Sequence, residues 1–171
     1  MNAKTQKAKP PFSLAYYRKD ERIIKLVKAT DQKTLAVWAM DCVERALPYF
    51  ENKYPKDQRP RRAIETLKTW IKSRGVKLAN IRKASLDAHG AAREVGEANA
   101  ACSAARAAGH AVATAHVPTH SIGAAIYALQ AIHRASNAAN AHEAVATERE
   151  WQYQHLLELK KKLASNLWEH L

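Results

Sequence analysis

The chain has 171 residues and a formal net charge of +12, with five glycines, six prolines and two cysteines. That length suits one domain, and the scarcity of alternating, strand-like segments predicts an all-α fold. The cysteine count excludes a disulfide-dense secreted domain, and the basic N-terminal sequence lacks the apolar core of a signal peptide, so we expect a cytoplasmic protein.

Apolar residues recur at helical spacing through the first part of the chain. Residues 1–12 are basic and end close to two prolines, so we expect an N-terminal arm ahead of one helical domain over residues 13–171. The first helix is expected over residues 13–29. Asp31 is a suitable N-cap for the next helix, and Pro48 should kink that helix or split off its last turn.

Five further helices are indicated by the prolines, glycines and apolar stripes later in the chain. They are expected over residues 60–75, 78–95 and 97–115, then from about Pro118, and finally from near Asn140 to the C-terminus. The sequence therefore predicts a single compact array of six or seven helices.

The 27 residues between Arg106 and Arg134 contain no Asp, Glu, Lys or Arg, and most of them are small. Because small side chains let helix backbones approach closely, this segment predicts an alanine-rich, closely packed centre. Several imidazoles and a proline would be costly in lipid, so we expect a protein interior and no membrane partner. The polar side chains expected to reach into this centre are His110, His116, His120 and His133.

His116 and His120 are four residues apart, a spacing that on a continuous helix places both imidazoles on one face for a metal. A proline lies between them, so we favour hydrogen bonds from the histidines to carbonyls freed at a helix break, and we assign no metal and no cofactor. His110 and Thr114 are also four apart and predict a buried polar contact or a pocket lining, which Tyr127 could meet from the next helix.

Asp41 and Glu44 lie three residues apart on one helix, where two carboxylates could do acid–base work. We favour a solvated or arginine-paired face instead, with Arg93 and Arg106 as candidate buried partners, and assign no catalytic residue. The candidate polar pocket comprises Asp41, Glu44, Arg93, His110, Thr114, His116, His120 and Tyr127.

Arg59, Arg61 and Arg62 lie at an expected helix start, where guanidiniums beside free backbone N–H groups could bind an anion. Equally, nearby carboxylates could neutralise them, for example with Arg61 pairing to Asp41 or Glu44 of the preceding helix. Both interpretations stay open at the level of the sequence.

Positive charge is concentrated in residues 1–83, which hold 21 Lys and Arg against 8 Asp and Glu, a net +13. Residues 84–171 hold 7 against 8, a net −1. Basic residues interleaved with Tyr16 and Tyr17 are a generic nucleic-acid pattern, although a solubilising face explains them equally well. Nucleic acid therefore stays open as a partner.

Several segments together resemble one protein family. The block AAGHAVATAHV over residues 107–117 is the most specific, and weaker blocks surround Trp38, Arg61, Trp70 and His89. Over about residues 35–155 the sequence resembles the small helical immunity proteins of bacterial polymorphic-toxin systems, the immunity protein five-like family. The resemblance implies a cytoplasmic, all-helical protein that binds and neutralises a toxin, and it names no substrate and no cofactor.

We consider three functions, in order of preference. The first is a non-enzymatic binding protein that masks a toxin domain with an acidic face, with Arg59, Arg61 and Arg62 as charged anchors and Trp70 as a packing anchor. The second is nucleic-acid binding by the basic half of the chain. The third is a metal-dependent or acid–base enzyme, which requires the histidine cluster to converge with the two carboxylates of the polar pocket.

Overall fold

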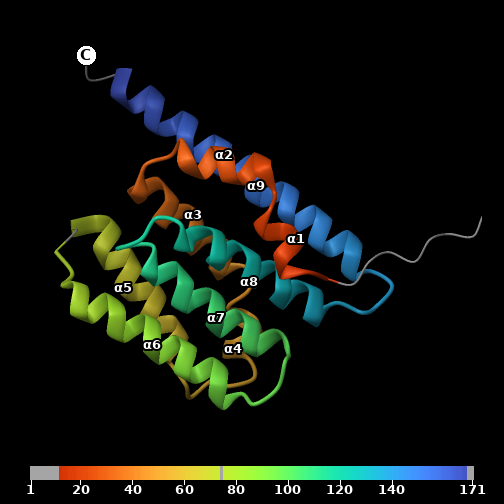
Figure 1. Cartoon of the computed structure of the whole chain (residues 1–171). Helices are drawn as coiled ribbons and strands as arrows, with labels where there is room; N and C mark the ends of the chain where they lie inside the picture. The colour runs from red at the N-terminus through yellow and green to blue at the C-terminus, as the bar shows by residue number, and fades with distance from the viewer. Residues whose placement is uncertain (1–11, 74, 169–171) are drawn as a thin grey trace, which may run out of the picture.

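The computed structural model describes residues 12–73 and 75–168, and these residues form nine α-helices and no strand (Figure 1). The all-α prediction is confirmed, whereas the prediction of six or seven helices is too low. The predicted arm lies, apart from its last residue, outside the described residues. In chain order the helices are α1 (Leu14–Arg18), α2 (Glu21–Lys28), α3 (Gln32–Glu44), α4 (Pro48–Glu51), α5 (Arg59–Ser73), α6 (Leu78–Glu94), α7 (Ala100–Ala113), α8 (His120–Ala135) and α9 (Ala141–Trp168).

The two additional helices arise where one expected helix is broken into two. In place of a single helix over residues 13–29, α2 starts anew because Asp20 caps it, accepting a hydrogen bond from the backbone N–H of Arg22 at 3.1 Å. Pro48 occupies the first turn of α4 and separates that helix from α3, in agreement with its expected effect. The break at Pro48 therefore follows from local backbone chemistry, and the break before α2 follows from the side-chain cap of Asp20.

Other helix ends also follow from local signals. Asp31 caps α3 by accepting a hydrogen bond from the backbone N–H of Thr34 at 3.0 Å, which confirms its predicted role. Asn99 caps α7 in the same way through the N–H of Cys102, also at 3.0 Å. Gly96 has a φ of +70° in the turn between α6 and α7, a conformation that favours glycine.

Helix α7 lies at the centre and packs against α3, α4, α5, α6 and α8. Within this helix only Ala100, Arg106 and His110 are not fully buried. Most of its buried residues are alanines, so the neighbouring backbones approach closely, and the predicted alanine-rich centre is confirmed. Arg106 and His110 are consequently the two places where α7 can present a polar group to a cavity.

A further layer lies beyond α8, where α9 packs against α8, α3 and α2 (Figure 1). Trp38 of α3 is fully buried there and donates a hydrogen bond from Nε1 to the carbonyl of Gln152 at 2.8 Å. Arg45 donates from Nε and Nη2 to the carboxylate of Glu148 at 2.8–3.0 Å. These contacts turn the polar side chains of α3 toward α9.

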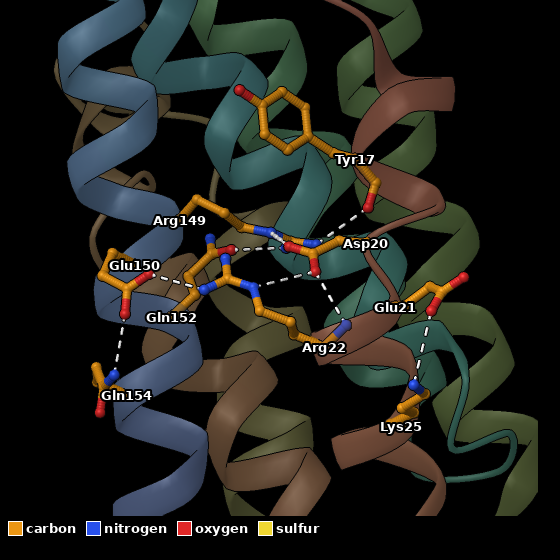
Figure 2. Close-up of polar contacts among 9 residues, drawn as sticks. All are labelled: Tyr17, Asp20, Glu21, Arg22, Lys25, Arg149, Glu150, Gln152 and Gln154. Carbon is orange, nitrogen blue, oxygen red and sulfur yellow. Dashed lines mark hydrogen bonds and ion pairs between the residues drawn. The ribbon is translucent and has the colours of Figure 1, made fainter.

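Arg149 of α9 joins the N-terminal helices to the rest of the molecule (Figure 2). Its guanidinium is 5% exposed and donates to Asp20 Oδ2 at 3.1 Å and to the carbonyl of Tyr17 at 3.0 Å. A third bond runs from Nη1 to Gln152 Oε1 at 3.1 Å. Burial raises the pKa of Asp20, but the positive charge and the hydrogen bond of Arg149 lower it by more, so that pKa lies below its ordinary value. The pair therefore stays ionised at neutral pH.

Within the described ranges, no helix is both long enough and apolar enough to cross a membrane. Cys42 and Cys102 are buried and form no disulfide. Burial raises the pKa of the Cys42 thiol well above its ordinary value, so this side chain packs as a small apolar group rather than a nucleophile.

Candidate functional site

Helices α6, α7 and α8 lie side by side and present polar side chains at spacings of three, four and seven residues. These side chains line two cavities, and the stacked rings of His110 and Tyr127, with centroids 5.2 Å apart, connect them. We call this set the polar seam. It comprises Arg82, Ser85, His89 and Arg93 of α6, Arg106 and His110 of α7, and His120, Tyr127, Gln130 and Arg134 of α8.

The histidine end of the polar seam is a cavity of about 260 Å³, lined by His89, His110, His116 and His120 together with Arg82, Ser85, Leu86 and Ala113. His110 Nδ1 lies 3.3 Å from His120 Nδ1, so one of these nitrogens carries the proton and the other accepts it. The His89 ring meets the His110 ring edge to face at 5.2 Å. His89 Nδ1 is buried and has no hydrogen-bond partner among the described residues.

Two glycines provide the space in which these imidazoles lie. A Cβ atom on Gly109 would come within 2.7 Å of His89 Nε2, and one on Gly123 would come within 2.7 Å of His110 Nδ1. Real Cβ atoms do not approach other atoms so closely, so the rings rest directly on the bare helix backbone. A glycine inside a helix lowers the stability of the fold by about 1 kcal/mol relative to alanine. At these two positions a larger residue would clash with an imidazole ring, which explains why glycine is present.

Burial keeps three imidazoles of this cavity neutral, those of His89, His110 and His120. It lowers the pKa of His110 to about 4, and the positive charges of nearby side chains, including Arg106, act in the same direction. Burial also lowers the pKa of His89 and of His120, and Arg106 and Arg93 add to the effect on His89. At pH 7 these three rings are therefore uncharged.

We expect acid to destabilise the fold through His110. In the unfolded chain an imidazole takes up a proton near pH 6.5, whereas in the folded protein His110 does so only near pH 4. The unfolded state thus binds more protons between these values, and stability falls as the pH is lowered through them. Relative to His110→Asn, the wild type should lose about 2 kcal/mol of unfolding free energy between pH 7 and pH 4.5.

Urea unfolding of both proteins at pH 7, 5.5 and 4.5 measures this effect. Carboxylates with lowered pKa values, such as Asp20, contribute equally to both proteins and cancel in the difference. If the difference between the two proteins were constant across the range, a buried, neutral His110 would be excluded.

The arginine end of the polar seam is a larger cavity of about 620 Å³, lined by Arg93, Arg106 and Arg134 with Tyr127 and Gln130. Arg134 donates from Nη1 to Ser103 Oγ at 2.8 Å, and Ser103 Oγ donates in turn to Gln130 Oε1 at 3.1 Å. Each arginine comes from a different helix, so this end gathers three guanidiniums that lie far apart in the sequence.

Two of the charged anchors predicted from the sequence are engaged within the molecule. Arg59 bonds the carboxylates of Asp57 and Glu94, and Arg61 bonds those of Glu44 and Glu51. For these two side chains, pairing with carboxylates is therefore the correct alternative, and an anion site at this helix start is not.

The remaining two anchors differ from each other. Arg62 is exposed and forms no ion pair with another described residue. Trp70 is only 6% exposed and belongs to the core, so its indole is not available as a surface anchor. An amphipathic helix places its large apolar residues toward the core, and α5 does so with Trp70.

The structure brings some residues of the predicted polar pocket together and places others apart. His110, His116, His120 and Tyr127 do come together, and Arg93 lies at the other end of the same seam. Thr114 is fully buried and donates to the backbone carbonyl of His110 at 3.3 Å, not to its imidazole. The hydrogen bond to a freed carbonyl that the sequence predicts for His120 is wrong, because His120 Nδ1 lies 3.3 Å from His110 Nδ1 instead.

The two carboxylates do not join the histidines. Asp41 Oδ2 lies 2.7 Å from Nε2 of His155 on α9, and Glu44 Oε1 lies 2.7 Å from Nη1 of Arg61. Their expected pairing with Arg93 and Arg106 is wrong, because α3 turns its polar side toward α9 and α5. The predicted convergence of His110, His116 and His120 with these two carboxylates is therefore not present in the described part of the chain. Among the described residues, no three His, Cys, Asp or Glu side chains are grouped so as to hold a metal ion.

Sequence reasoning left His89 and Arg134 out of the site. A usable signal was present, since His89 lies four residues from both Ser85 and Arg93, and Arg134 lies four residues after Gln130. Polar residues at that spacing on otherwise alanine-rich helices indicate one polar stripe per helix.

Comparison with known proteins identifies one matching family. A family model described as Imm-5 like putative immunity protein matches residues 25–159, which agrees with the resemblance seen in the sequence and extends it toward the N-terminus. The match includes the whole polar seam. Neither a curated protein nor a solved structure matches the chain significantly. Since the match spans well over half of the 171 residues, this chain belongs to the Imm-5 like immunity protein family.

Proposed function

We propose that the protein is an immunity protein, a non-enzymatic inhibitor that binds a toxin domain in the bacterial cytoplasm and blocks its action. The family match over residues 25–159 carries this proposal. Binding proteins of this kind act through a surface rather than through a reaction, so the question becomes which face of the helical array meets the toxin.

We infer that the histidine end of the polar seam forms the centre of that face. Leu86 is 65% exposed and lines the cavity there, and the exposed Val117 follows His116 in the chain. Leu86, Ala113 and the neutral rings of His89, His110 and His120 make much of the cavity wall apolar. A few side chains in well-packed pockets that exclude water contribute most of the energy in protein interfaces, and Leu86 lies where it could make such a contact with a partner.

The charge around this face favours an acidic partner surface. Arg82 lines the cavity and is exposed, and Arg62, which lines neither cavity but belongs to a helix that packs against α6, is exposed as well. Neither forms an ion pair with another described residue. Of the anchors expected from the sequence, Arg62 is thus the one that retains a free guanidinium for a toxin carboxylate, which would steer association more than it would strengthen it.

Capture from the host separates this proposal from nucleic-acid binding. Tagged protein is recovered from its own host in high salt after nuclease treatment, and the bound material is identified by mass spectrometry. The proposal expects one protein in stoichiometric amount. If the untreated sample contains nucleic acid and the nuclease-treated sample contains no protein partner, the result would favour nucleic-acid binding by the basic half of the chain.

We expect Leu86→Asp to weaken the complex with the captured toxin by more than about thirtyfold, because a central apolar anchor contributes about 2 kcal/mol or more. Tyr49→Asp is the matched control, since Tyr49 is also a partly exposed apolar residue and lines neither cavity of the polar seam. Titration calorimetry on both variants measures the change. Equal affinities for the two variants would show that this face is not the interface.

A further inference from the structure

Three arginines line one cavity at the other end of the polar seam, and toxin binding through Leu86 does not explain why they lie together. Arg93, Arg106 and Arg134 are the only lysines or arginines between residues 84 and 148, and all three line the same cavity. One comes from α6, one from α7 and one from α8, so the packing of three helices assembles them.

These guanidiniums are not neutralised by carboxylates. None of the three forms an ion pair with a residue in the described part of the chain. Glu97 is the one acidic residue that lines the cavity in this part of the chain, and its side chain is 72% exposed and lies 3.7 Å from Lys53 Nζ. Arg93 is exposed, whereas Arg106 and Arg134 are half-buried. The half-buried Arg59 and Arg61 and the buried Arg149, by contrast, each bond a carboxylate.

The cavity is also built to hold its polar groups in place. Ser103 is fully buried and fixes Arg134 by accepting from Nη1, while it donates to Gln130. His110 stacks against the Tyr127 ring with an interplanar angle of 16°, so that ring is held as well. Arg134 is thus held in place before an anion binds, and each of the three guanidiniums can form two parallel bonds to a phosphate or carboxylate.

We propose that the cavity at the arginine end of the polar seam binds a small polyanion that carries at least two phosphate or carboxylate groups. A ligand with several negative charges can neutralise all three arginines, whereas a single carboxylate would neutralise only one of them. The volume of about 620 Å³ is in the range of small-molecule sites. This inference goes beyond toxin binding and does not depend on it, because Leu86 belongs to the other cavity.

Titration calorimetry with pyrophosphate and with citrate, at constant ionic strength, tests the site on the whole protein. We expect saturable binding of at least one of them with a Kd below about 1 mM. Binding of pyrophosphate identifies phosphate as the recognised group, and binding of citrate identifies carboxylate. Absence of binding by both anions would overturn the proposal.

Arg106→Gln and Arg93→Gln should each weaken this binding at least about tenfold, because each removes charge-assisted hydrogen bonds. Arg62→Gln removes the same charge from α5, outside both cavities, and should leave the Kd unchanged. Urea unfolding confirms that each variant is folded before it is titrated. Equal weakening in all three variants would indicate a response to net charge only and would overturn the site. Toxin affinity of the Leu86 variant is measured separately, so either proposal can fail alone.

Discussion

Replacing Arg149 with alanine should lower the free energy of unfolding by about 3–5 kcal/mol, the range for breaking a buried ion pair. The guanidinium is almost fully buried and bonds Asp20, the carbonyl of Tyr17 and Gln152, so its removal leaves three polar groups without their partner (Figure 2). Because Asp20 also caps α2, the N-terminal helices should loosen together. Urea unfolding monitored by circular dichroism measures the loss.

Arg22→Ala is the matched control for this prediction. Arg22 also bonds a carboxylate of α9, that of Glu150 at 3.1 Å, but its side chain is 53% exposed. An exposed ion pair contributes about 1 kcal/mol or less. If both variants lost the same small amount, Arg149 would not be the link that holds α1 and α2 to α9.

Gly123→Ala should cost about 1–3 kcal/mol, although alanine is the better helix former. The new Cβ would lie within 2.7 Å of His110 Nδ1 and would push the ring away from its place between His120 and Tyr127. Gly90→Ala is the control, because a Cβ there has no neighbour closer than 3.5 Å. We expect that variant to gain as much as about 1 kcal/mol.

The His110→Ala background shows whether the ring causes the cost of Gly123→Ala. Without the imidazole, the added methyl group has room, so the second substitution should become neutral or stabilising when measured against His110→Ala alone. Thermal and urea unfolding of the single and double variants complete the cycle. An undiminished cost in the double variant would mean that the glycine is required for another reason.

Much of the fold could be predicted because its signals are local. Asp31 caps a helix with its own side chain and Pro48 breaks one through its missing N–H, and both effects act within a few residues. The break between α1 and α2 was missed for the opposite reason. Asp20 is held in its capping position by Arg149, and the sequence gives no indication that residues so far apart meet.

The site was predicted less completely, because it depends on which helices become neighbours. His110 and Tyr127 lie on consecutive helices joined by a short turn, so their meeting could be anticipated. His89 contributes only because α6 packs against α7 in the register that places its ring over Gly109. For the carboxylates, the pairing of Glu44 with Arg61 was among the predicted alternatives and is present, whereas Asp41 meets His155, which the sequence did not indicate because the direction of α3 relative to α9 was unknown.

Growth protection tests the central claim most directly. The captured toxin domain is expressed in a heterologous bacterium together with the wild-type protein, Leu86→Asp or Tyr49→Asp, each at matched levels. The account predicts that the wild type and Tyr49→Asp restore growth and that Leu86→Asp does not. Leu86 lies at the histidine end of the polar seam, whereas Tyr49 does not line that cavity. Failure of the wild type to protect, or equal protection by Leu86→Asp, would contradict it.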